Sequence, residues 1–223
     1  MLRAVIFDFD GVIVDTEWPA YSAWRTVFAE HGADLTIEEF ARCIGTRGAI
    51  DFNALIEAKT GAPAPSNEQL RAWKQPLEAA TIATLPLLPG VRDWLDAAAA
   101  SGLPVAIASS SERWWIEPHL ARHGISHYFR YLSTWDGPDA GFPPKPAPDL
   151  YTRCVEALGV APHETLAIED SLNGCTSAKA AGLRCLAIPS RLTAHLDFSA
   201  ADGVVESLAA FSLADAQEQF GRA

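Results

Sequence analysis

Short apolar runs alternate with longer amphipathic segments along most of this chain. Runs rich in branched residues predict buried strands at about residues 5–7, 104–108, 131–134, 165–168 and 184–188, with a short sixth strand at 204–205. Helical spacing of apolar residues predicts helices at about 91–101, 112–123, 148–158 and 172–181, and a last helix from about 206. Strands that alternate with helices indicate a doubly wound parallel sheet.

One long segment departs from this alternation. Between the first and second predicted strands only helical patterns occur, at about 17–32, 36–43, 47–60 and 66–84. Gly45 and Gly48 interrupt the pattern, and Ser66 is the expected N-cap of the last of these helices. We therefore predict a Rossmann-like α/β core domain, made of residues 1–16 and 85–223, with an inserted all-helical domain at 17–84.

Composition narrows the class of protein. With 223 residues, 49% of them apolar and 20% charged, the chain is typical of a globular protein. Its net charge of −11, without any basic stretch, argues against a nucleic-acid partner. Four cysteines without a C-x-x-C pair predict reduced thiols and a cytoplasmic protein. No apolar run reaches membrane-spanning length, and no repeat or heptad indicates self-association, so we expect a monomer without membrane contact.

Two carboxylates follow the first predicted strand. Asp8 and Asp10 are two residues apart and are followed by Gly11. In open α/β sheets, ligands bind beyond the carboxyl ends of the strands. Neighbouring carboxylates repel one another unless a cation or a shared proton relieves them, and Mg²⁺ prefers such oxygen ligands. The simpler alternative is an ordinary strand end or turn, and an isolated D-x-D by itself favours that alternative.

Polar residues also occur at the ends of two other predicted strands and on one loop. Ser109 ends the second strand, where its hydroxyl and the neighbouring amides suit phosphate oxygens, and Ser110 or Ser111 is the expected cap of the next helix. Lys145 lies between prolines on a loop, and Glu169 and Asp170 end the fourth strand. Each has a simple structural alternative: a helix cap, an exposed lysine, and acids at a helix N-terminus.

Four segments together are far more specific. DFDGVIVDTE, IASSS, KPAPDLY and AIEDSLNG occur in the order and context of the four motifs of the haloacid dehalogenase-like superfamily. The chain resembles the branch of that superfamily which contains β-phosphoglucomutase and small sugar-phosphate phosphatases.

The resemblance implies a role for each motif residue. Asp8 is the expected nucleophile, which forms an aspartyl-phosphate, and Asp10 the general acid and base, with its backbone carbonyl on the metal. Ser109, with Ser110, and Lys145 are the expected phosphate-binding residues. Asp8, Asp10, Glu169 and Asp170 are the expected Mg²⁺ site.

The inserted helices resemble the cap of this branch, which closes over the site and selects the substrate. Thr16 corresponds to the hinge, and Gly45, Thr46 and Arg47 form the expected specificity loop. Position 20 is alanine, where β-phosphoglucomutase carries a histidine.

The resemblance thus implies a Mg²⁺-dependent phosphatase for a small phosphorylated metabolite, expected to be a sugar phosphate. A phosphosugar mutase is the main alternative, and a haloacid dehalogenase or a non-catalytic binding protein is less favoured.

Overall fold

A parallel sheet forms the centre of the larger part of the molecule. The computed structural model describes residues 1–221. In this part of the chain six strands stand in the order β3-β2-β1-β4-β5-β6. They are β1 (Ala4–Phe7), β2 (Val105–Ser109), β3 (Phe129–Thr134), β4 (Thr165–Glu169), β5 (Arg184–Ala187) and β6 (Gly203–Val204). Every neighbouring pair is parallel, and the order reverses direction between β1 and β4, which makes that point the expected place for a ligand.

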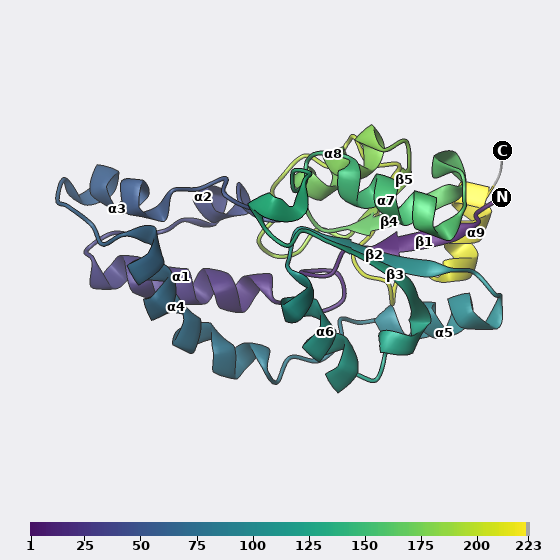
Figure 1. Cartoon of the computed structure of the whole chain (residues 1–223), viewed down its shortest axis with the longest axis horizontal. Coiled ribbons are helices and arrows are strands. Elements are labelled where there is room, and N and C mark those ends of the chain that lie inside the picture. The colour runs from purple at the N-terminus through teal and green to yellow at the C-terminus, as the bar shows by residue number, and fades with distance from the viewer. Residues whose placement is uncertain (222–223) are drawn as a thin grey trace.

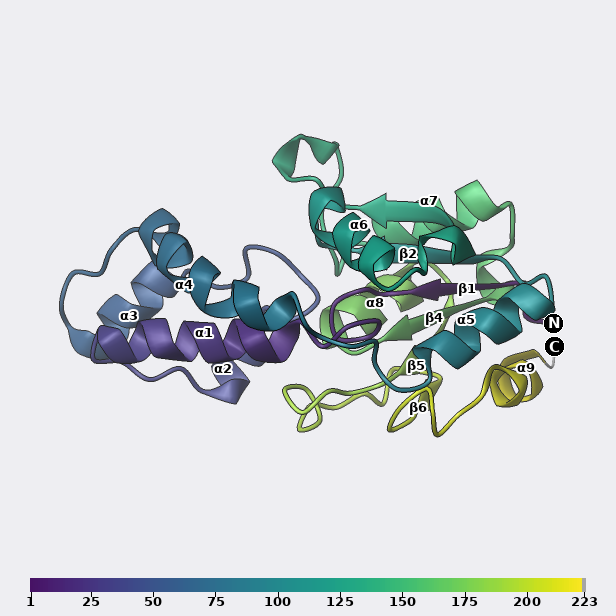
Figure 2. The same ribbon diagram turned by 90° about the horizontal axis from the view of Figure 1, so that it is seen from below.

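Helices cover both faces of the sheet (Figures 1 and 2). One face packs against α5 (Val91–Ala100), α6 (Arg113–Arg122) and α9 (Leu213–Gly221). The other packs against α7 (Asp149–Leu158) and α8 (Leu172–Ala180). Short 3₁₀ helices lie at Ser126–Tyr128, Pro138–Ala140 and Pro162–Glu164. The predicted doubly wound α/β fold is confirmed.

The first strand shows why the apolar runs are nearly continuous. Val5 and Phe7 belong to the core beneath α5, α6 and α9, whereas Ile6 belongs to the core beneath α7 and α8. Successive side chains alternate across a strand, so a strand buried on both faces needs apolar residues at every position.

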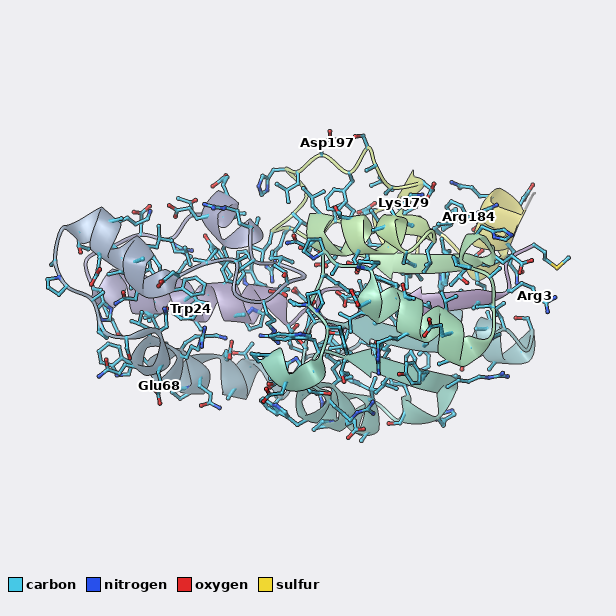
Figure 3. The ribbon with its side chains drawn as sticks, turned by 45° about the horizontal axis from the view of Figure 1, so that its top comes forward. Arg3, Trp24, Glu68, Lys179, Arg184 and Asp197 are labelled. Carbon is cyan, nitrogen blue, oxygen red and sulfur yellow. The ribbon has the colours of Figure 1, made fainter. Side chains whose placement is uncertain are left out.

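A second group of helices lies beyond the carboxyl ends of the strands, apart from the sheet (Figures 1 and 2). This helical unit consists of α1 (Glu17–Glu30), α2 (Ile37–Ala41), α3 (Phe52–Thr60) and α4 (Asn67–Ile82). It has its own apolar cluster, in which Trp24 of α1 stacks on Phe52 with ring centroids 3.9 Å apart. Figure 3 labels Trp24 in this unit, and Lys179 and Arg184 in the sheet-containing part. The proposed domain boundaries at residues 16/17 and 84/85 stay a prediction.

The loop after β5 connects the two parts. Leu192 is 1% exposed and packs into the apolar cluster of the helical unit. The neighbouring Arg191 lies 3.5 Å above the ring of Trp18 and pairs with Asp15 at 3.3 Å. Thus the sheet-containing part supplies a side chain to the core of the helical unit.

Two predicted helices begin later than expected. The segment assigned to a helix from residue 47 becomes helical only at Phe52, because Asp51 accepts a capping hydrogen bond from the Ala54 amide (3.1 Å) and Gly48 adopts a positive φ of 74°. The last helix begins at Leu213 rather than near residue 206. The intervening turns direct the Leu208 and Phe211 carbonyls toward Trp94, whose Nε1 donates to both of them.

The ends of other helices and strands agree more closely with the prediction. Ser66 caps α4 through a capping box with Gln69, as predicted. The third strand begins two residues before its predicted start, at Phe129. None of the described helices is both long and apolar enough to cross a bilayer.

The contact made by Leu192 can be tested by truncation. We expect Leu192→Ala to lower the free energy of unfolding by about 2–5 kcal/mol, because it leaves a cavity in the shared apolar cluster. Leu77→Ala is the matched control: Leu77 is 46% exposed, so its truncation should change stability by no more than about 0.5 kcal/mol. Urea unfolding of both variants measures the difference, and equal stabilities would contradict the assignment.

Candidate active site

A buried ion-paired lysine joins two of the predicted site residues. Asp8 follows β1, and its backbone amide donates to the Ile168 carbonyl of β4 (2.9 Å), so it lies at the switch point of the sheet. Lys145 is fully buried, and its Nζ donates to Asp8 Oδ1 (2.8 Å) and to Glu169 Oε1 (2.6 Å). The Tyr151 hydroxyl donates to the same oxygen of Glu169 (2.5 Å). The predicted loop lysine is therefore an internal cation.

Burial and charge shift the proton affinities of this group. Burial raises the pKa of Asp8 to about 7. The Lys145 charge acts to lower this pKa, and the Glu169 charge acts to raise it. Although burial acts to lower the pKa of Lys145, the carboxylates of Asp8 and Glu169 raise it above its usual value. Lys145 is therefore charged at neutral pH, and one ammonium faces two acidic side chains.

Asp170 adds a third buried carboxylate. Both of its oxygens are buried, and neither has a hydrogen-bond partner among the described residues. Burial, and next the Asp8 charge, raises the pKa of Asp170 well above its usual range. Its neighbour across the site is Gly11, where an added Cβ would lie 2.0 Å from Asp170 Oδ2. A side chain at position 11 would therefore occupy the space next to the carboxylate.

These carboxylates form a set suited to a divalent cation. One oxygen each of Asp8, Glu169 and Asp170 lie within 4.8 Å of one another. Buried charges need compensation, and Lys145 alone does not balance three of them. Carboxylate oxygens without other partners are the ligands that a hard ion such as Mg²⁺ takes, so the residues present fit the metal. The set does not include the carboxylate of Asp10, and the contact expected through its backbone carbonyl stays a prediction.

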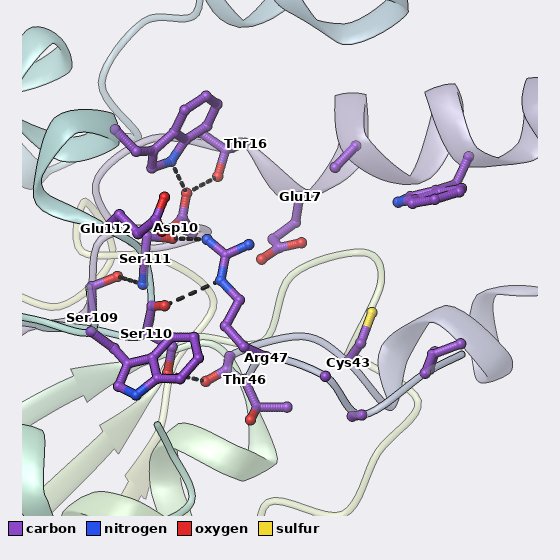
Figure 4. A pocket seen from close by; sticks show the side chains of 18 of the residues that line it. Asp10, Thr16, Glu17, Cys43, Thr46, Arg47, Ser109, Ser110, Ser111 and Glu112 are labelled. Atoms are coloured by element: carbon purple, nitrogen blue, oxygen red, sulfur yellow. Dashed lines mark hydrogen bonds between the residues drawn. The ribbon is translucent and has the colours of Figure 1, made fainter. Parts of the chain in front are cut away.

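Asp10 is held by three donors. Its Oδ1 accepts hydrogen bonds from Thr16 Oγ1 (2.5 Å) and Trp115 Nε1 (2.9 Å), and its Oδ2 accepts one from Ser111 Oγ (2.5 Å). Figure 4 labels Asp10, Thr16 and Ser111 and shows the hydrogen bond between Thr16 and Asp10. Thr16 directly precedes α1, so the predicted hinge residue contacts the predicted acid–base residue.

The serines after β2 do not cap the next helix as expected. Ser109 Oγ accepts from the Ser111 amide (3.0 Å), and Ser110 Oγ donates to the Gly45 carbonyl (3.0 Å) and accepts from the Lys145 amide (3.2 Å). The first amide of α6, that of Arg113, is instead bonded by Asp136 Oδ1 (2.9 Å) from the loop after β3. Because Asp136 bonds this amide, the serines are not used at the helix terminus and instead contact one another, Gly45 and Lys145.

The loop between α2 and α3 packs onto these serines (Figure 4). Arg47 donates from Nε to the Ser110 carbonyl (3.1 Å) and from Nη2 to Ser111 Oγ (2.8 Å). Thr46 Oγ1 donates to the Lys145 carbonyl. Gly45 approaches so closely that an added Cβ would lie 2.0 Å from Ser171 Oγ. The predicted specificity loop thus contacts the segments that carry Ser109, Lys145 and Asp170.

A pocket of about 570 Å³ opens between the helical unit and the sheet. It is lined by Asp8, Asp10, Ser109, Arg47, Glu17 and Ala20, among others. Burial, and next the Asp10 charge, raises the pKa of Glu17 to about 8. Lys145 and Asp170 are fully buried and do not line the pocket.

Some residues of the site were not predicted. Trp115 and Ser111 bond Asp10, Tyr151 bonds Glu169, and Glu17 lines the pocket. Glu17 and Tyr151 lie inside DFDGVIVDTE and KPAPDLY, so the motifs contained a signal for both. Trp115 had no such signal, because only the packing of α6 against the loop after β1 brings it to Asp10.

Comparison with known proteins places the chain in a family. Residues 5–188 match the sequence model of the family described as "Haloacid dehalogenase-like hydrolase". The chain is 36% identical to YhcW of Bacillus subtilis (strain 168), over 96% of both chains. It is 31% identical to "Fructose-1-phosphate phosphatase YqaB" of Escherichia coli (strain K12), over 80% of this chain and 92% of that one.

The fold of a solved structure matches that of nearly the whole chain. CbbY from Rhodobacter sphaeroides, crystallised with xylulose-(1,5)bisphosphate, superposes with a TM-score of 0.77 and is 30% identical, over 96% of this chain and 99% of that one. The protein therefore belongs to the haloacid dehalogenase-like hydrolases, and the resemblance inferred from its motifs is confirmed.

Ion binding should stabilise the protein more at high pH than at low pH. The pKa of Asp8 is raised from 3.8 to about 7, and that of Asp170 is raised as well. Carboxyls that bind protons more tightly when folded contribute stability at low pH, and that stability is lost as the pH rises toward and through 7. We expect Mg²⁺ to raise Tm more at pH 8 than at pH 5, in thermal unfolding with Mg²⁺ and with EDTA.

The Asp170→Asn variant supplies the control. It should lose most of the Mg²⁺-dependent rise in Tm, and in EDTA at pH 8 it should melt above the unmodified protein, because a buried carboxyl whose raised pKa costs stability at high pH has been removed. The stability that comes from the raised pKa of Lys145 is the same at pH 5 and at pH 8, because it is lost only at higher pH. A Mg²⁺ effect equal at both pH values, or retained in the variant, would contradict the assigned site.

Proposed function

We propose that this hydrolase is a Mg²⁺-dependent phosphatase that transfers the phosphoryl group of a small sugar phosphate to Asp8 and then to water. The observation that carries the proposal is the buried set of Asp8, Glu169 and Asp170 around Lys145, with both oxygens of Asp170 unpartnered. The named activity of YqaB, a fructose-1-phosphate phosphatase, and the bisphosphate bound to CbbY support the substrate class.

The nucleophile is Asp8. Its carboxylate attacks phosphorus, which forms an aspartyl-phosphate and releases the alcohol. Because the pKa of Asp8 is raised to about 7 by burial, Lys145 is needed beside it to favour the ionised form. The same ammonium reduces the repulsion between the carboxylate and the phosphoryl oxygens.

The metal would be held by Asp8 and Asp170, with Glu169 adjacent and the Asp10 carbonyl as the proposed further ligand. When bound, Mg²⁺ neutralises charge on the phosphoryl oxygens and orients them for in-line attack. Ser109 and Ser110 are the proposed phosphate-binding residues, and the contact of the Lys145 amide with Ser110 Oγ (3.2 Å) supports their place beside Lys145.

Asp10 is the proposed general acid and base. It would protonate the leaving alkoxide in the first step and deprotonate water in the second. Its carboxylate and that of Asp8 line the same pocket. Gly45, Thr46 and Arg47 are the proposed specificity loop, since they hold the helical unit against the serines.

One pocket-lining residue of α1, Ala20, favours a phosphatase over a mutase. Ala20 lines the pocket at the position where the resemblance places a mutase histidine. A methyl group cannot bind a sugar hydroxyl or transfer a proton. Water is therefore the expected acceptor of the phosphoryl group.

The nucleophile can be tested directly. We expect the wild-type protein to release phosphate from a panel of sugar phosphates with Mg²⁺ but not with EDTA. Asp8→Asn should lower kcat about a thousandfold or more, because the covalent step is lost. Brief incubation with substrate, acid quench and peptide mass spectrometry should find one phosphoryl group on the peptide that contains Asp8.

The matched control is Asp34→Asn, the same chemical change on a carboxylate of the helical unit whose side chain is 80% exposed. It should retain full activity. Phosphate release by Asp8→Asn at the wild-type rate would refute the assignment. Conversion of β-glucose 1-phosphate to glucose 6-phosphate without release of phosphate would show a mutase instead.

A further inference from the structure

One contact of Asp10 comes from a residue outside the four motifs. Trp115, in the first turn of α6, donates its indole N–H to Asp10 Oδ1 at 2.9 Å. Its ring also packs against His119, one helical turn further on, with centroids 5.1 Å apart. We propose that Trp115 is a positioning residue that orients the acid–base carboxyl of Asp10 toward the reacting oxygen. The proposal rests on the phosphatase function proposed above.

The three donors to Asp10 differ in what holds them. Thr16 is the N-cap of α1, and Ser111 accepts a hydrogen bond from Arg47 (2.8 Å), so both connect to the helical unit. Trp115 belongs to a helix packed on the sheet. A movement of the helical unit would therefore disturb the surroundings of Thr16 and Ser111 while the contact with Trp115 stays in place. Trp115 keeps Asp10 oriented between successive substrates.

The chemistry of the indole group adds a second consequence. An indole N–H can only donate, whereas a serine hydroxyl can donate or accept. Asp10 Oδ1, with donors from Trp115 and Thr16, is therefore the accepting oxygen, and a proton carried by Asp10 resides on Oδ2, next to Ser111. Trp115 thus determines which oxygen of the carboxyl transfers the proton.

The proton balance of the reaction follows from this assignment. As the bond from Asp8 to phosphorus forms, the bond to the leaving oxygen breaks, and that oxygen takes its electron pair and the proton from Asp10 Oδ2. In the second step water attacks phosphorus and gives one proton back to Oδ2. The electron pair of the bond to Asp8 then returns to the Asp8 carboxylate.

A comparison of leaving groups tests the role. An alkyl phosphate needs a proton for its leaving alkoxide, whereas p-nitrophenyl phosphate has a stable leaving anion and needs none. Trp115→Phe keeps an aromatic ring and removes the N–H. We expect it to lower kcat/KM about tenfold or more for an alkyl sugar phosphate and less than about twofold for p-nitrophenyl phosphate. Asp10→Asn should show the same selectivity with a larger loss.

A double variant distinguishes positioning from a general structural effect. If Trp115 acts through Asp10, adding Trp115→Phe to Asp10→Asn should not change the ratio of the two kcat/KM values further. Trp114→Phe is the matched control, because the neighbouring indole N–H donates to Glu112 and not to Asp10, so the ratio should equal that of wild type. Trp115→Leu, which also lacks a side-chain donor, replaces the phenylalanine variant if that variant does not fold.

The outcomes separate the two proposals. Equal losses for the two substrates, or losses that add in the double variant, would overturn the role of Trp115 and leave the phosphatase function intact. A wild-type protein that releases no phosphate from either ester in Mg²⁺ would overturn the proposed function, and this inference with it.

Discussion

The buried ammonium of Lys145 is the interaction on which the site depends. It lies in the sheet-containing part without solvent exposure and contacts Asp8 and Glu169 directly. A buried charge is stable only when it is paired, and the two carboxylates would repel each other without it. With Lys145 between them, the end of β1 and the end of β4 can both carry acidic side chains. Asp170 then remains with both carboxylate oxygens unpartnered, which is the basis of the proposed site for a divalent cation.

The helical unit contacts this arrangement through the backbone and side chains of one short loop. Thr46 bonds the carbonyl of Lys145, and Arg47 bonds Ser110 and Ser111, which in turn contact Lys145 and Asp10. From the other side, Leu192 anchors the loop after β5 in the apolar cluster of the unit, and Thr193 Oγ1 of that loop donates to the Asp170 carbonyl (2.8 Å). The helical unit thus contacts the segments that carry the proposed nucleophile, the proposed acid–base residue and the proposed metal site.

Short-range sequence patterns predicted the central strands and one helix cap correctly, but gave a wrong start for one helix and a wrong cap for another. Apolar runs located the central strands because both of their faces are buried, and the serine cap of α4 followed from a short-range pattern. Helical spacing predicts a helix from residue 47, but Gly48 adopts a positive φ and Asp51 caps the helix, so that it begins only at Phe52. The serines after β2 are good caps by type, yet Asp136, more than twenty residues away, bonds that helix terminus instead. Local propensity could not anticipate a competitor from another segment.

By itself the sequence determined the doubly wound fold, the inserted helices and the motif residues at strand ends, because these depend on the spacing of residue types along the chain. Only the tertiary structure decided how those residues are used. It buried Lys145 between two carboxylates, left the oxygens of Asp170 without partners, and brought Trp115 to Asp10 across 105 positions. Such contacts arise where separate segments pack against one another, and the spacing of residues within one segment carries no information about the distance to another.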